Sequence, residues 1–126
     1  MKKDRGFSLL ELLIVVAIIL IIATIAIPSL LRSRQAANES AAVANIRTIN
    51  TAQVTYLSSA GGVYGDFTNL YSLGLMDGRW SATTPTVSGF SFTLTVATGG
   101  GSYTILASPN GTSGRCSFAS SEAGVA

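Results

Sequence analysis

The sequence predicts an α+β fold, in which a long N-terminal helix packs by its second half on a small antiparallel sheet of about three strands. The helix is predicted because residues 7–60 contain no glycine and a single proline, Pro28. The sheet is predicted because apolar and polar residues alternate from Gly89 onward, with the period of a half-buried strand. The 126 residues leave room for one small domain beside an apolar segment.

The first half of the predicted helix, residues 7–31, is apolar enough to cross a membrane. No charged residue occurs in residues 12–31. A helix of about 20 residues spans a hydrocarbon core of about 30 Å. The preceding residues 1–6 are basic, so by the positive-inside rule this end stays in the cytoplasm and the C-terminal part is exported.

One acid, Glu11, interrupts the start of the apolar run between two pairs of leucines. A charged side chain inside a membrane costs on the order of 2.5–3.5 kcal/mol on insertion scales. Such a residue is by default a functional one whose partner has to be identified. Glu11 is therefore the first candidate functional residue of the chain.

The second half of the helix, residues 32–60, is predicted to be amphipathic and to pack on the globular part. Pro28, near the junction of the two halves, removes one backbone hydrogen bond and is expected to kink the helix. The helix then continues to a predicted stop at Gly61. One face of this half is apolar, with Gln53 within it. The apolar positions are Ala42, Val43, Ile46, Ile49, Tyr56 and Leu57.

Residues 61–126 are predicted to form a globular head that begins with a connecting loop. The loop contains a short helical turn over residues 68–75. Three leucines are expected to attach this turn to the core: Leu70, Leu73 and Leu75. Strands are predicted at 90–96, 103–108 and 115–119, separated by turns rich in Gly, Pro and Asn.

The composition argues against an enzyme and against a nucleic-acid-binding protein. The chain has no histidine, no paired acids in a pocket-like context and no Gly-rich phosphate motif, so no catalytic, cofactor or metal site is predicted. A membrane-anchored enzyme or binding module is accordingly the least favoured class. The net charge of +2 comes from residues 1–6, and the remainder is near neutral, so direct binding of nucleic acid is not expected.

The N-terminal sequence, KKDRG followed by FSLLELLIVVAIILIIATIAIPSL, resembles the N-terminus of type IV pilins and of the related pseudopilins of type II secretion. The resemblance implies that a prepilin peptidase cuts after Gly6 and that the new N-terminal Phe7 is N-methylated. It also implies that Glu11 is the acid used in assembly. Pro28 matches the proline that bends the long helix in this family.

The resemblance also indicates a partner for Glu11. Cleavage would give Phe7 a free α-amino group, which is cationic at neutral pH. Phe7 and Glu11 are four residues apart, so a contact within one helix is geometrically allowed. The resemblance implies instead that Glu11 reaches the amine of a neighbouring subunit during assembly. Such a pair would fix axial register more than it would add stability.

The function that the resemblance implies is that of a structural subunit of a type IV pilus-like filament, which serves surface attachment, motility or DNA uptake. The subunit would polymerise through its helix after leader cleavage and methylation. Its partners would be further copies of the chain, the prepilin peptidase/methyltransferase, the inner membrane before assembly and the pilus assembly machinery. It would lie in the bacterial inner membrane as a single-pass precursor and then in the cell-surface pilus. The alternative is a pseudopilin of a type II secretion or competence system.

The C-terminal part departs from two patterns of the family. Many pilins close their C-terminal loop with a disulfide, which the single cysteine of this chain cannot form. Cys116 is expected instead to be a small buried residue of the third strand. Major pseudopilins often carry an acidic calcium loop near the C-terminus, and no such loop is seen here. The stabilisation of the outer loop is therefore left open.

Overall fold

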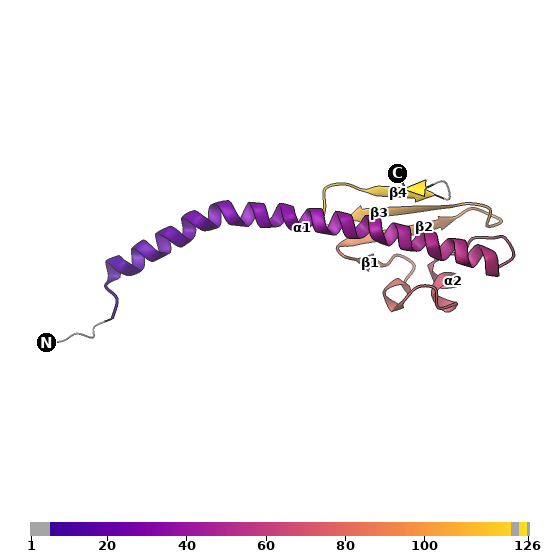
Figure 1. The fold of residues 1–126 in the computed structure, drawn as a ribbon, viewed down its shortest axis with the longest axis horizontal. Coiled ribbons are helices and arrows are strands. Elements are labelled where there is room, and N and C mark those ends of the chain that lie inside the picture. The colour runs from indigo at the N-terminus through magenta and orange to yellow at the C-terminus, as the bar shows by residue number, and fades with distance from the viewer. Residues whose placement is uncertain (1–5, 122–123, 126) are drawn as a thin grey trace. The chain divides into compact units, whose positions relative to one another are not determined.

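The computed structural model describes residues 6–121 and 124–125 (Figure 1). Of the predicted leader, residues 1–5 lie outside the described part of the chain. The chain divides into two compact units after Ser33. The α+β fold class is confirmed, with one long N-terminal helix and an antiparallel sheet.

The first unit contains the beginning of helix α1 (Leu9–Ser59). Every residue from Gly6 to Ser33 is exposed except Ala23, which is half-buried. Within the described residues, α1 is the one helix long and apolar enough to cross a membrane, with a mean hydropathy of 3.1 in its most apolar window. Exposed apolar surface of this extent indicates a membrane or protein interface.

Helix α1 continues through Pro28. Proline has no N–H group, so it cannot donate to the carbonyl of Thr24 one turn earlier. The hydroxyl of Thr24 itself donates to the carbonyl of Ile21 at 2.7 Å. The kink expected at Pro28 remains a prediction.

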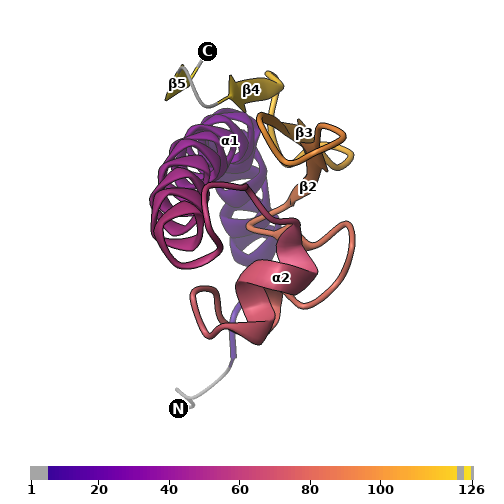
Figure 2. The same cartoon turned by 90° about the vertical axis from the view of Figure 1, so that its right-hand side faces the viewer.

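In the second unit, residues 34–59 of α1 lie along one side of the sheet, as Figure 2 shows. The predicted amphipathic pattern is confirmed. The buried residues of the helix are Ala42, Ile46, Ile49, Ala52 and Gln53. The residues of the opposite face are exposed: Ser40, Arg47, Thr48, Thr51 and Thr55. Burial of this one face holds the helix on the head.

The sheet is an antiparallel meander of five strands in chain order. The strands are β1 (Thr86–Val87), β2 (Phe90–Val96), β3 (Tyr103–Pro109), β4 (Phe118–Ser121) and β5 (Gly124–Val125). The long hairpin of β2 and β3 was predicted from the alternating pattern and is confirmed. The edge strands β1 and β5 have two residues each, too few to show a period in the sequence.

The inner face of the sheet and α1 share one hydrophobic core. Phe90, Phe92 and Ile105 are fully buried, and the β3 pattern alternates strictly between buried and exposed over its first five residues. Trp80 packs edge-on against Phe92, with ring centroids 4.9 Å apart, and lies 5.4 Å from the ring of Phe67. These aromatic contacts attach the connecting loop to the sheet.

The connecting loop contains helix α2 (Phe67–Ser72) and a 3-10 turn, η1 (Gly78–Trp80). Asp66 caps α2 through the backbone N–H of Asn69, whose side chain accepts from the backbone N–H of Asp66 in return. Of the three leucines expected to attach this turn, Leu70 is buried and Leu75 is half-buried. The prediction for Leu73 is wrong: its side chain is 56% exposed, because α2 ends at Ser72 and Leu73 lies in the turn that follows.

Two polar side chains of α1, the buried Gln53 and the half-buried Asn50, bind backbone or hydroxyl groups of the head. Gln53 donates to the carbonyl of Gly65 at 2.7 Å and accepts from the N–H of Gly65 at 3.1 Å. Asn50 accepts from the hydroxyl of Tyr103 at 2.7 Å and donates to the hydroxyl of Ser120 at 3.0 Å. Because these groups are satisfied, their burial does not carry the cost of unpaired polar atoms.

The prediction of a third strand over 115–119 is wrong at its N-terminal end. Strand β4 begins at Phe118, and Cys116 is exposed rather than buried. The backbone N–H groups of Arg115 and Cys116 both donate to the carboxylate of Glu39 on α1. These two groups are therefore bound to a helix side chain and do not join the strand ladder.

Candidate assembly and processing site

Gly6 and Phe7 lie before the first turn of α1, outside regular secondary structure. The side chain of Phe7 is 82% exposed, and no atom lies within 4 Å of the position that a Cβ on Gly6 would take. A peptide bond with exposed flanks and no helical hydrogen bonding is accessible to a peptidase. Gly6 and Phe7 are therefore exposed and outside the helix, and cleavage between them remains a prediction.

Glu11 occupies the first turn of α1 and forms a reciprocal cap with Ser8. The backbone N–H of Ser8 donates to Oε1 of Glu11 at 3.1 Å, and the backbone N–H of Glu11 donates to the hydroxyl oxygen of Ser8 at 3.1 Å. This arrangement is a capping box, which satisfies two backbone donors that the start of a helix leaves unpaired. A carboxylate in the first turn also interacts favourably with the helix dipole.

The capping box changes the predicted geometry around Phe7. Because α1 begins at Leu9, Phe7 is not part of the helix, so the helical spacing that would allow a contact between Phe7 and Glu11 within one chain is absent here. Ser8 was not among the predicted site residues. The signal for it is present in the sequence as Ser8-Leu-Leu-Glu11 directly before an apolar run, the pattern of a capping box.

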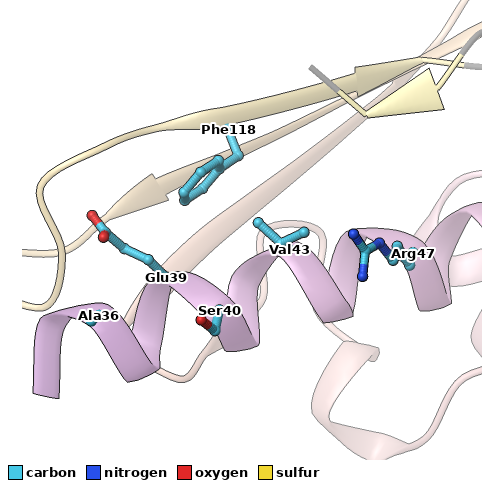
Figure 3. Close-up of a pocket in the computed structure, with 6 residues that line it drawn as sticks. All are labelled: Ala36, Glu39, Ser40, Val43, Arg47 and Phe118. Atoms are coloured by element: carbon cyan, nitrogen blue, oxygen red, sulfur yellow. The ribbon is translucent and has the colours of Figure 1, made fainter. Parts of the chain in front are cut away.

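A groove of about 460 Å³ lies between α1 and β4, and Figure 3 shows the residues that line it. They are Ala36, Glu39, Ser40, Val43, Arg47 and Phe118. The ring of Phe118 faces Val43, with the carboxylate of Glu39 to one side and the guanidinium of Arg47 farther along the helix (Figure 3). The groove is open and carries one acid and one base, an arrangement that suits contact with a surface more than chemistry on a small molecule.

The carboxylate of Glu39 is already engaged by the protein. Oε2 accepts from the backbone N–H of Arg115 at 2.7 Å and from that of Cys116 at 3.0 Å. These two bonds lower the pKa of Glu39, and the nearby charge of Arg115 adds to the effect. Glu39 is therefore held as an anion with a structural partner.

A second acid with a lowered pKa lies in the connecting loop. Asp77 accepts from Nε and Nη2 of Arg79 and from the backbone N–H of Arg79, and these bonds lower the pKa of Asp77. The same carboxylate raises the pKa of Arg79. Both side chains are more than half exposed, so the pair is a surface ion pair of small energetic weight. Among the described residues, no group of three or more His, Cys, Asp or Glu side chains is placed to hold a metal ion.

Comparison with known proteins identifies a motif and two relatives. Residues 1–27 match the prokaryotic N-terminal methylation motif. The chain is 33% identical over 112 residues to the type IV wide pilus major component PilA4 of Thermus thermophilus, covering 87% of this chain and 86% of that protein. It is 43% identical over 67 residues to the type IV major pilin protein PilA of Myxococcus xanthus, covering 53% of this chain. The latter match spans only 30% of the Myxococcus protein.

Proposed function

The chain belongs to the type IV pilin family, and we propose that it is the structural subunit of a type IV pilus-like filament. In this proposal the leader is removed after Gly6, Phe7 is methylated on its new amine, and subunits polymerise through the apolar part of α1. The match over 86% of a wide pilus major component supports the role of a main subunit. The methylation motif over residues 1–27 supports the processing.

The observation that carries the proposal is the exposure of the first part of α1. Its large apolar side chains, from Leu9 to Leu31, are each 44% or more exposed in the isolated chain. A helix that is apolar all round is stable in lipid or in the centre of a protein assembly. The same residues therefore suit an inner-membrane precursor and the core of a filament, because neither environment contains water.

Glu11 can serve assembly without giving up its cap. The bond from Ser8 uses Oε1, and an ionised carboxylate has about four acceptor sites on its two oxygens. The carboxylate can therefore receive the cationic Phe7 amine of a neighbouring subunit while it still caps its own helix. The cap also restricts where the carboxylate lies, which reduces the entropy lost on pairing.

The pair between subunits would fix axial register. Apolar helices pack through contacts that change little when one helix slides along another, whereas a charge pair in a low-dielectric core depends steeply on distance. Because every subunit carries one acid and one amine at the same end, the pair would favour a single axial shift between neighbouring helices. This step is a proposal that follows from the position of Glu11 and the expected amine.

Two measurements on material from the native cell test the proposed function. Mass spectrometry of the mature protein should show an N-terminus at Phe7 with about 14 Da added by one methyl group. Electron microscopy of material sheared from the surface should show filaments that contain the chain. A mature protein that starts at Met1 or after Ala26 contradicts the proposal. Correct processing without extracellular filaments would favour the pseudopilin alternative.

A further inference from the structure

The loop between β3 and β4, residues 110–117, is attached to α1 by three polar side chains. Gln35 donates to the carbonyl of Thr112 and Asn38 to the carbonyl of Ser113, both at 2.9 Å. Glu39 accepts from the next two backbone N–H groups that reach the helix, at 2.7 and 3.0 Å. Positions 35, 38 and 39 form one stripe along a helix, so the loop runs beside α1 over about one turn.

The loop packs closely at Gly114, which is buried between Phe90 of β2 and Glu39 of α1. A Cβ on Gly114 would lie 2.6 Å from the ring of Phe90 and 3.3 Å from the Cγ of Glu39. The absence of a side chain at Gly114 lets the backbone come near enough for Glu39 to reach the two N–H groups that follow. The approach and the hydrogen bonds therefore depend on each other.

The loop leads directly into β4, whose first residue is Phe118. The Phe118 ring lies 6.1 Å from that of Phe90 and faces Val43 across the groove (Figure 3). Ala107 pairs with Phe118 at the end of the β3–β4 ladder, so the residues between Pro109 and Phe118 are outside the ladder. Asn110 is still bound to the start of β2, because its N–H donates to the carbonyl of Gly89 and its side chain accepts from the hydroxyl of Ser91. The hydrogen bonds that join residues 112–116 to another segment go to α1.

We propose that Glu39 is an anionic latch, whose ionised carboxylate holds residues 114–117 on α1 and whose neutralisation frees this segment while the sheet stays intact. The latch takes the place of the covalent closure that a single cysteine cannot supply. Gln35 and Asn38 make neutral bonds that do not titrate, so the loop stays attached at Thr112 and Ser113 and opens beyond them. The opening also uncovers the Phe118 end of the groove.

The charged groups around the latch determine its dependence on pH. Arg115 from the loop is the cation whose charge acts on Glu39, and Arg47 lines the same groove farther along α1. The side chain of Cys116 also lies beside Glu39. Because the fold lowers the pKa of Glu39, the latch is fully present above about pH 5 and is lost as the pH falls through the folded-state pKa.

Amide hydrogen exchange on the full-length chain in detergent micelles tests the latch. At pH 7, Glu39→Gln keeps the shape and loses the charge, and protection at the amides of Arg115 and Cys116 should fall roughly tenfold, since charge-assisted bonds are about twice as strong as neutral ones. Glu39→Ala should abolish protection at both amides. Protection in β2 and β3 should be unchanged in both variants.

The matched control is Asp77→Asn, which removes another exposed acid with a lowered pKa and should leave residues 114–117 protected. As the pH is lowered below the ordinary range of a carboxyl group, protection at these two amides in the wild type should fall toward the Glu39→Gln level, after correction for the intrinsic exchange rate. Unchanged protection in Glu39→Ala would overturn the latch. Equal protection in wild type and Glu39→Gln would show that charge is not needed, and loss of protection across the whole sheet would show that the opening is not local.

Discussion

Ser8 and Glu11 cap the same helix start for each other, with two backbone-to-side-chain hydrogen bonds of 3.1 Å. The acid that interrupts the apolar run therefore already has a partner within one chain. Its placement at the third helical position is what a capping box requires. The position of Glu11, from which an assembly role is inferred, is thus also the position that caps the helix just after the exposed residues Gly6 and Phe7.

We predict that Ser8→Ala loosens the first turn of α1 by about 1 kcal/mol, because an N-cap hydroxyl is lost. Amide exchange of the full-length chain in micelles should show faster exchange at Glu11 and at Leu12, whose N–H donates to the carbonyl of Ser8. Ser8→Thr retains the hydroxyl and should exchange like the wild type. Equal protection in all three proteins would show that the cap contributes nothing to the helix start.

We predict that Glu11→Gln and Glu11→Ala both impair assembly, although only Glu11→Ala also removes the helix cap. Glutamine serves at the third position of a capping box, so Glu11→Gln keeps the helix start and loses the charge, whereas Glu11→Ala loses both. If register depends on the charge pair, both variants are cleaved after Gly6 and inserted normally, and both assemble poorly, by tenfold or more in filament yield. Filament mass per cell and the ratio of precursor to mature chain are the measurements. Normal filaments from Glu11→Ala would refute the register argument.

We predict that Gln53→Ala destabilises the head by about 2 kcal/mol, because it leaves the buried N–H and carbonyl of Gly65 without their side-chain partner. Thermal unfolding followed by near-UV circular dichroism of the buried Trp80 should show a lower midpoint. Thr51→Ala, on the exposed face of the same helix, is the control and should change the midpoint little. A wild-type midpoint in Gln53→Ala would mean that water replaces the side chain at no cost.

The sequence predicts the parts of this fold that repeat a pattern. The strand over 90–96 shows its period in seven consecutive residues, and the structure has β2 at the same bounds. The short turn around Leu73 shows no period, so the sequence does not distinguish the exposed Leu73 from the leucines that pack on the core. Gly6 and Phe7 could be proposed as processing residues from the sequence alone, because a peptidase recognises a short local segment.

Contacts between distant segments account for what the sequence does not predict. Whether the stretch before Phe118 forms a strand is decided by Glu39, which is 76 and 77 residues away from the two amides it binds. In the sequence, Glu39 looks like any solvent-exposed acid on an amphipathic helix. The backbone N–H groups that it binds cannot be predicted from the side chains, because every residue except proline has one. Long-range bonds from side chain to backbone thus override the local preference for strand at Cys116.

We predict that Gly65→Ala destabilises the head by about 1–3 kcal/mol, the usual cost of overpacking a tight site. A Cβ at this position would lie 2.8 Å from Cε1 of Tyr56 and 2.8 Å from the Cβ of Asn69, so both the ring and the start of α2 would have to shift. The shift would also strain the two bonds between Gln53 and the Gly65 backbone. Gly78→Ala is the control, because its Cβ would meet no atom within 4 Å. Unfolding midpoints of the two variants should separate clearly, and equal midpoints would show that the Tyr56 ring moves aside freely.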